Sequence, residues 1–88
     1  MKIKKFLTKA RWCQGEWAKD KNGNYCAVLS RKAVKFCLMG AVAKCYPGRT
    51  LAIGARLRDA LGMCVTTFND SPLTTFKEVK ALVTRLDI

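Results

Sequence analysis

The segment TFKEVKALVTRL, residues 75–86, carries the clearest structural signal in the chain. Its apolar residues recur at the spacing of one helix face: Phe76, Val79, Leu82, Val83 and Leu86. Such a stripe, with polar residues between its members, is typical of an amphipathic helix that packs on a core. Thr75 and Glu78 fit a capping box, in which the threonine side chain bonds forward and the glutamate reaches back to the helix start.

Three segments upstream show the same period, with the stripes Ile3, Phe6, Leu7 and Ala10; Val34, Leu38, Ala41 and Cys45; and Ile53, Leu57, Ala60 and Leu61. We predict one helix from each stripe. The first helix should end near Trp12. Ser30 is a good N-cap for the second helix, which Pro47-Gly48 stops. Thr50 can cap the start of the third helix, and Gly62 is suited to its end.

The segment between the first two predicted helices is less regular. Asn22-Gly23 is a strong turn dipeptide. It predicts one of two arrangements. The first is a short hairpin around this turn, and the second is a turn-rich loop that packs Trp12, Trp17 and Tyr25 onto the core.

Residues 63–68 form a short apolar, β-branched run that predicts one strand or a buried extended link, and residues 69–72 predict a turn. The fold class that follows is mainly α, a compact bundle of about four helices with a short hairpin or extended element. A chain of 88 residues has the size of a single domain, which we place over residues 1–88.

Gly40 lies inside the predicted second helix. A glycine there costs about 1 kcal/mol relative to alanine. We therefore expect Gly40, next to Ala41, to lie where the backbone of another segment approaches closely.

The five cysteines are odd in number, no two have C-x-x-C spacing, and the chain has no histidine. We expect five reduced thiols, no metal and no cofactor. The apolar stretch from Phe36 to Ala43 is too short to cross a bilayer, and Lys9 and Arg11 interrupt any signal-peptide core. The expectation is a cytoplasmic protein that does not enter a membrane.

The net charge of +11 is unevenly distributed, because residues 1–49 hold twelve basic and two acidic side chains. Such one-sided charge indicates either an acidic protein surface or nucleic acid as partner, or a basic face that only keeps the protein soluble, and the two interpretations stay open. Arg31 and Lys32 would add charge at a helix N-terminus, which itself attracts anions. The candidate anion- or nucleic-acid-binding residues are Lys2, Lys4, Lys5, Lys9, Arg11, Arg31, Lys32 and Lys35.

No catalytic set is evident, and we expect no enzyme. Cys37 lies on the apolar stripe of the second predicted helix without a histidine to activate it, so we interpret it as a core residue. Asp70 and Glu78 are better explained by a turn and a helix cap than as paired carboxylates.

Four loop residues are the candidates for a ligand site: Trp12, Gln14, Asn69 and Asp70. Tryptophan can stack on a base, and a glutamine amide can recognise a polar edge. The alternative, which we favour, is that Trp12 anchors the loop to the core while Gln14 bonds loop backbone.

Five short motifs follow one another along the chain: Trp12-Cys13-Gln14-Gly15, Asp20 with Gly23, Cys37-Leu38-Met39-Gly40-Ala41, Phe68-Asn69-Asp70 and Thr74 to Val79. In this order the chain resembles a family of small uncharacterised proteins from bacteriophages and bacterial genomes, with the patterns W-x-Q-G, C-L-x-G-A and aromatic-N-D. The resemblance covers about residues 7–86 and implies a shared fold and a phage context, with no particular chemistry.

The leading functional hypothesis is a non-enzymatic, phage-type accessory protein that binds and modulates a host component, for instance as a counter-defence factor. The alternative is a basic, largely non-specific nucleic-acid-binding protein. A second alternative is a small-ligand or nucleotide binder that uses the four loop residues.

Overall fold

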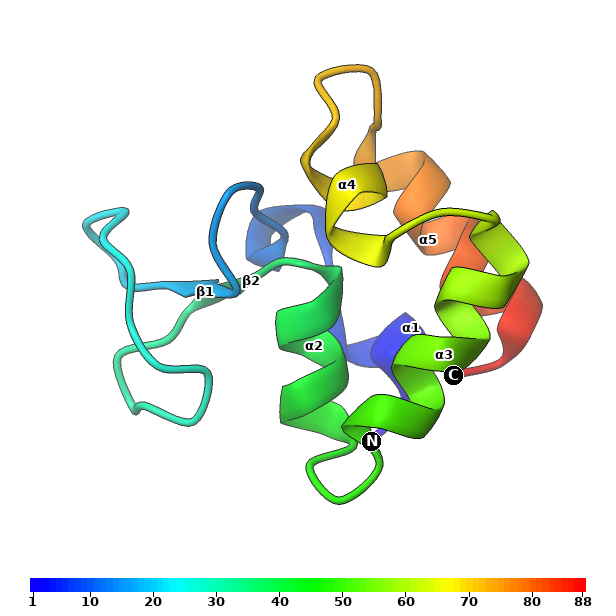
Figure 1. The fold of residues 1–88 in the computed structure, drawn as a ribbon. Coiled ribbons are helices and arrows are strands. Elements are labelled where there is room, and N and C mark those ends of the chain that lie inside the picture. The colour runs from blue at the N-terminus through cyan, green and yellow to red at the C-terminus, as the bar shows by residue number, and fades with distance from the viewer.

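The computed structural model describes all 88 residues. Helices dominate it, in the order α1 (Ile3–Phe6), η1 (a 3-10 turn, Lys9–Arg11), β1 (Ala18–Lys19), β2 (Lys35–Phe36), α2 (Leu38–Cys45), α3 (Thr50–Leu61), α4 (Val65–Asp70) and α5 (Phe76–Leu86). Five α-helices and one two-stranded sheet confirm the mainly helical fold, with one helix more than predicted. In Figure 1 the helices pack together and the strands lie to one side. No helix combines the length and the apolar composition that crossing a bilayer requires.

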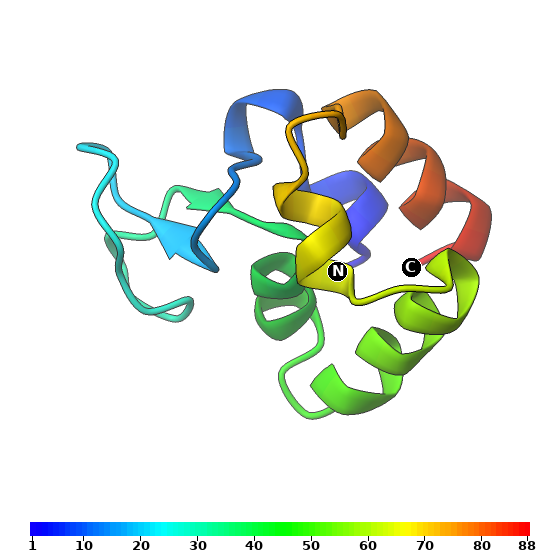
Figure 2. The same ribbon diagram turned by 45° about the horizontal axis from the view of Figure 1, so that its top comes forward.

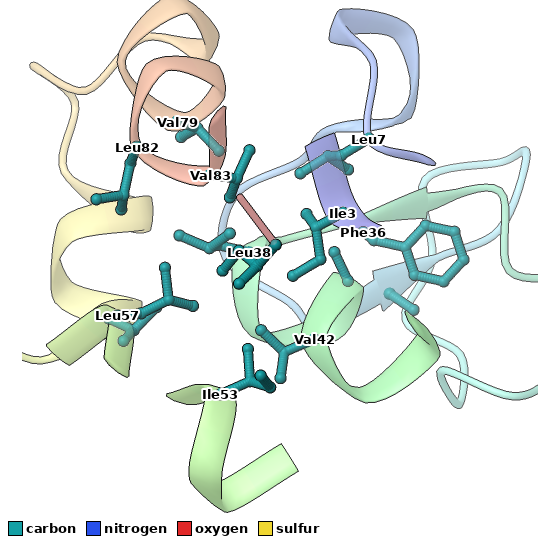
Figure 3. Close-up of a cluster of buried hydrophobic side chains, with 14 residues drawn as sticks. Ile3, Leu7, Phe36, Leu38, Val42, Ile53, Leu57, Val79, Leu82 and Val83 are labelled. Atoms are coloured by element: carbon teal, nitrogen blue, oxygen red, sulfur yellow. The ribbon is translucent and has the colours of Figure 1, made fainter. Parts of the chain in front are cut away.

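The core lies where the helices meet, and 14 buried apolar residues form one cluster there. In Figure 3, Leu38 of α2 points into the middle of this cluster, with Leu57 of α3, Val83 of α5 and Ile3 of α1 around it. All four side chains are fully buried. Burying a side chain of this size contributes about 1.5–3 kcal/mol, so this cluster is the main source of stability.

The two longest helices, α3 and α5, follow the sequence prediction. The capping box of α5 is formed, and the Thr75 N–H donates to Glu78 Oε1 at 3.2 Å. Gly62 ends α3 in the left-handed conformation, with φ 69°. Two details differ, because Thr50 is the first helical residue rather than the cap, and Ala60 is exposed.

The predicted first helix is broken into two short pieces. Ile3 and Leu7 are fully buried as expected, but α1 is a single turn and Thr8 is extended. The chain then re-forms as η1, and Ala10 is exposed. The break redirects the chain so that Trp12 reaches β2, where it forms a bridge with Phe36. Tertiary packing here overrides the local helical period.

The predicted start of the second helix, with Ser30 as its N-cap, was wrong. This helix, α2, begins at Leu38, and the side chain of Cys37 caps it by accepting the Gly40 N–H at 3.3 Å. Ser30 caps only a turn, in which its Oγ accepts the Lys32 N–H at 3.1 Å. Val34 is 44% exposed, so it is not a core residue. The helix ends at Cys45, before Pro47, as predicted.

Residues 63–68 were predicted as a strand or an extended link, and this was also wrong. The chain forms α4 from Val65 to Asp70, with Cys64 at its N-cap. The helix buries Val65 and Asn69, one turn apart, on the same side. Burial of these two side chains outweighs the β-branched composition of the run, which taken alone favours a strand.

Residues 18–36, which we call the lobe, project from the helical body in both ribbon views (Figures 1 and 2). β1 pairs with β2 in antiparallel register, Ala18 opposite Phe36 and Lys19 opposite Lys35. The Asn22-Gly23 turn is formed inside the lobe, where Gly23 has φ 83° and its N–H donates to the Asp20 carbonyl at 3.0 Å. Directly across this turn Lys19 forms an antiparallel bridge with Tyr25, so the predicted hairpin exists in a minimal form. The partner strand of β1, β2, lies farther along the chain, at the other end of the lobe.

The aromatic side chains around the lobe do not behave alike. Trp12 is half-buried, and its ring centroid lies 6.0 Å from that of Phe76 on α5. Trp17 and Tyr25 are 41% and 66% exposed. The expectation of three aromatic anchors holds for Trp12 alone.

Gly40 confirms the predicted close approach of two backbones. A Cβ built on Gly40 would lie 1.8 Å from the carbonyl oxygen of Trp17. The Trp17 carbonyl in turn accepts the Cys37 N–H at 3.2 Å, so the base of the lobe rests directly on the first turn of α2. Only a residue without a side chain fits at this point.

Candidate functional site

The side chain of Asn69, at the end of α4, is fully buried and bonded on every side. Its Oδ1 accepts hydrogen bonds from Trp12 Nε1 at 2.7 Å and from the Leu38 N–H at 3.0 Å. Its Nδ2 donates to the Cys13 carbonyl at 3.1 Å and to Asp70 Oδ1 at 2.9 Å. Two donors and two acceptor positions are all that an amide side chain offers, so Asn69 has no capacity left for a ligand.

The other two candidate loop residues complete this arrangement. Gln14 Nε2 donates to the carbonyl oxygens of Asn69 and Ser71, both at 2.9 Å. Asp70 Oδ1 also accepts the Gly15 N–H at 3.0 Å. The structure thus brings the four predicted residues together as a clasp that ties the loop of residues 12–15 to the end of α4. We call Trp12, Gln14, Asn69 and Asp70 the Asn69 clasp.

A polar cavity of about 610 Å³ opens between this clasp and the lobe. Its wall includes Trp12, Gln14, Lys19, Asp20, Lys21 and Lys35. The carboxylate of Asp20 is turned to its own loop, where Oδ1 accepts the N–H groups of Asn22 and Asn24 at 2.9 and 3.0 Å. Three ammonium groups around one cavity make it attractive to an anion. We call it the lysine cavity.

Lys19 and Lys35 are direct partners across the β1–β2 pair. Neither forms a salt bridge, since the only two in the chain involve Lys2 and Lys4. Burial raises the pKa of the nearby Cys13 thiol, the positive charges of Lys19 and Lys35 lower it in part, and the carboxylates of Asp70 and Glu16 raise it slightly. Both ammonium groups therefore lie close enough to Cys13 to act on its thiol.

The sequence-predicted basic residues separate into two groups. The Nζ atoms of Lys2 and Lys4 lie 2.7 and 2.6 Å from Asp87 Oδ1, so their charges are largely used inside the protein. The others are exposed and without salt bridges: Lys5, Lys9, Arg11, Arg31, Lys32 and Lys35. Arg31 and Lys32 lie in a turn and not at the start of a helix, which removes the helix-dipole argument for them.

Sequence reasoning missed Lys19 and Lys21. Both flank Asp20 just before the Asn22-Gly23 turn, and this position next to a turn was the only available signal. Their placement beside Lys35 depends on the register of β1 and β2, which bridges residues far apart in the chain.

A second cavity of about 1060 Å³ has a mainly apolar wall, made by α3, the start of α4 and Trp17. We call it the apolar groove. Leu51 and Met63 line it and are 89% and 41% exposed. Cys64 also lines it, and a hydrogen bond with the Thr66 hydroxyl is the main cause that lowers the pKa of its thiol to about 7.

The cysteines and the two carboxylates considered for catalysis, Asp70 and Glu78, have structural contacts. Cys37 is buried, as expected, although it caps α2 instead of lying mid-helix. Burial raises the pKa of its thiol to about 11, which keeps it protonated at neutral pH. Glu78 takes the capping role that the sequence assigned to it. The turn predicted for residues 69–72 was wrong at its start, because Asp70 is the last residue of α4, where its Oδ1 accepts the Gly15 N–H. All five cysteines are free thiols, and no cluster of three or more His, Cys, Asp or Glu side chains is arranged to hold a metal ion.

A family model matches residues 2–86, which include the Asn69 clasp and the lysine cavity. The chain belongs to the family of unknown function DUF6197. This agrees with the resemblance to an uncharacterised family that the motifs indicated. No curated protein and no solved structure matches the chain. In this member of the family, any functional conclusion therefore depends on the geometry described above.

Proposed function

We propose that this protein is a non-enzymatic binding protein that holds nucleic acid on its basic surface through phosphate contacts. One observation carries the proposal. Of the 17 lysine and arginine side chains, only Lys2 and Lys4 form salt bridges. Uncompensated positive charge on a small domain attracts a polyanion and releases its counterions on binding.

The unpaired basic residues lie on neighbouring segments. Lys9 and Arg11 belong to η1, and Lys35 belongs to β2. Trp12, the residue that follows η1, forms a bridge with Phe36 of β2. The basic side chains of η1 and of the lobe can therefore face one extended anionic partner together, as binding along a nucleic-acid backbone requires.

A salt titration on a labelled 20-mer duplex tests this function. Each phosphate that the protein neutralises should contribute a slope of about −0.9 in log K against log salt concentration. Replacing Lys5, Lys9 and Lys32 by glutamate should weaken binding to all sequences alike and flatten the slope. The matched control reverses three exposed basic residues elsewhere: Lys44, Lys77 and Arg85.

The two variants have the same net charge, so they separate a defined surface from total charge. A much larger loss in the first variant supports the proposal. Absence of wild-type binding at low salt would overturn it, and an equal loss in both variants would contradict a defined basic surface.

A second candidate is a phage-type accessory protein that binds and modulates a protein of the host. The apolar groove favours it, because Leu51 and Met63 expose large apolar side chains beside it. Exposed apolar surface of this kind is typical of protein–protein contacts. The test is capture of a host protein from nuclease-treated lysate, which Leu51→Asp should abolish and the Lys5, Lys9 and Lys32 variant should retain.

For either function we propose the cytoplasm, of the host if the chain is phage-encoded, as the compartment. Five free thiols are compatible with a reducing environment. The third candidate is a small-ligand binder that uses the Asn69 clasp. It has less support, because both polar atoms of Asn69 and Oδ1 of Asp70 are already hydrogen-bonded within the protein.

A further inference from the structure

The β1–β2 pair contains an arrangement that costs stability. Each strand has two residues, and in one of the two pairs Lys19 lies directly opposite Lys35. Like charges directly opposite each other in an antiparallel pair are destabilising. A sheet of only two residue pairs has few other interactions to offset the repulsion between Lys19 and Lys35. A bound anion between the two ammonium groups would offset it.

None of the carboxylates around the lysine cavity forms a salt bridge with its lysines. Asp20 lies in the wall but accepts two N–H groups of its own turn. Asp70 accepts the Gly15 N–H and a hydrogen of Asn69 Nδ2. Glu16 is exposed and forms no salt bridge. The lysines, including Lys21, therefore face the cavity without an ionic partner.

The clasp residues determine what else the cavity offers. Trp12 lines the cavity and has its indole N–H already bonded to Asn69, so its aromatic ring is the part of the side chain left for a ligand. Gln14 uses Nε2 on two carbonyl groups, which leaves Oε1 as a free acceptor. An aromatic surface beside lysines is the combination with which proteins hold single-stranded nucleic acid. The volume of about 610 Å³ lies within the usual range of ligand sites.

We propose that the lysine cavity is the anchoring site for a single nucleic-acid strand, with one phosphate held between Lys19 and Lys35 and the adjoining nucleoside against Trp12. This inference rests on the proposed function and gives it a specific site. A concave site receives a flexible strand more readily than a duplex, which carries its phosphates on a stiff convex surface.

The first test compares two variants on a labelled single-stranded dT 20-mer and on a duplex. One carries Lys19→Gln and Lys35→Gln, and the control carries Lys44→Gln and Lys77→Gln. Losing the anchored phosphate should weaken binding of the single strand about tenfold and make the salt slope shallower by about 0.7. The control and the duplex should change much less.

The second test is thermal unfolding without nucleic acid. Lys35→Glu turns the repulsion with Lys19 into an attraction, so the free protein should gain about 2–4 °C in Tm. Inorganic phosphate at millimolar concentration should raise the Tm of the wild type and leave that of Lys35→Glu unchanged. These readouts do not depend on binding of a strand. The same thermal unfolding of the variant with Lys19→Gln and Lys35→Gln shows that it is folded.

The outcomes separate the site from the function. If the wild type binds neither the strand nor the duplex, the proposed function fails and the strand proposal fails with it. If the wild type binds but the two glutamine pairs weaken binding equally, the lysine cavity is not the anchoring site, while the basic surface stands. If phosphate stabilises the protein but no strand binds, the cavity takes free phosphate and the strand proposal is overturned.

Discussion

The side chain of Asn69 shows how one residue can hold distant segments in place. It bonds to Trp12, Cys13 and Leu38, which belong to a loop and to the start of a core helix. Each of these three groups would lack a partner if Asn69 were replaced by an apolar residue. A buried polar group without a partner costs about 1–3 kcal/mol.

Replacing Asn69 by leucine, which has a similar size, should therefore lower the free energy of unfolding by about 3 kcal/mol or more. Urea denaturation followed by tryptophan fluorescence measures the loss. Asn24→Ala, at an exposed position, is the control and should change stability by about 0.5 kcal/mol or less. A loss for Asn69→Leu as small as that of the control would contradict the role of Asn69 in the clasp.

The cysteines differ in reactivity because their surroundings differ. The pKa of Cys64 is lowered to about 7, chiefly by the Thr66 hydroxyl, whereas burial raises that of Cys37 to about 11. The thiolate is the reactive form, so Cys64 should be alkylated first by iodoacetamide, with a rate that rises as the pH passes about 7. Peptide mass spectrometry identifies the modified site. In Cys64→Ser the fast phase should disappear, and its persistence would show that another thiol is responsible.

At the scale of helices and strands, prediction from the sequence succeeds where local signals and tertiary packing agree. The apolar stripe and capping box of α5 lie in one continuous segment, so α5 could be predicted completely. The start of α2 could not be predicted, because Phe36 pairs with Ala18, 18 positions earlier in the chain. This pairing holds residues 35–36 in a strand, so the helix begins later than its apolar stripe suggests. α4 was missed because three of the four hydrogen bonds of its buried polar residue, Asn69, go to groups from other segments.

The candidate site was predictable to a similar extent. Trp12, Gln14, Asn69 and Asp70 were expected to lie together and do, although Asn69 and Asp70 belong to the end of α4 and not to a loop. Their hydrogen-bond partners could not be inferred, since these depend on the approach of two segments more than fifty residues apart. The lysine cavity could not be predicted at all, because it depends on a sheet of only two residue pairs.

The contact between α2 and the base of the lobe gives a prediction about a whole element. Alanine is the better helix former, yet Gly40→Ala should destabilise the protein by about 1–3 kcal/mol, because its Cβ would overlap the Trp17 carbonyl. Gly48→Ala is the matched control, since nothing lies within 4 Å of the added atom. Thermal unfolding of both variants decides the matter. A higher Tm for Gly40→Ala than for the wild type would disprove the close contact.

For the whole molecule, the two ends of the chain are held together by charge. Asp87 pairs with Lys2 and Lys4 next to α1, and these bonds lower its pKa from the ordinary value of 3.8 to about 2. A lowered carboxyl pKa stabilises the folded state above the unfolded pKa, and this contribution is lost as the pH falls from about 4 to about 2. The pair is exposed to solvent, so salt should weaken it.

Asp87→Asn should therefore have a lower Tm than the wild type at pH 6 and a smaller further decrease between pH 4 and pH 2. Scanning calorimetry at low and high salt measures both. Asp59→Asn is the control, because Asp59 forms no salt bridge and should follow the wild-type profile. Identical acid profiles for Asp87→Asn and the wild type would show that the two lysine contacts carry no stability.

The projecting lobe has a consequence for how the molecule opens. Residues 20–34 are mostly exposed, and apart from the bonds of Cys26 and Val34 to β1 their backbone hydrogen bonds close local turns. Their amides should therefore exchange with solvent far sooner than those of the helical body. The same stretch contains Lys21, Arg31 and Lys32, which are cleavage points for trypsin. A first nick there should leave the body folded, since none of the 14 buried core residues lies between 20 and 34, and Cys26, Val28 and Ala33 pack against the cluster only partly buried. If nucleic acid bound at the lobe slows this cleavage, the rate of tryptic cleavage measures binding without any label.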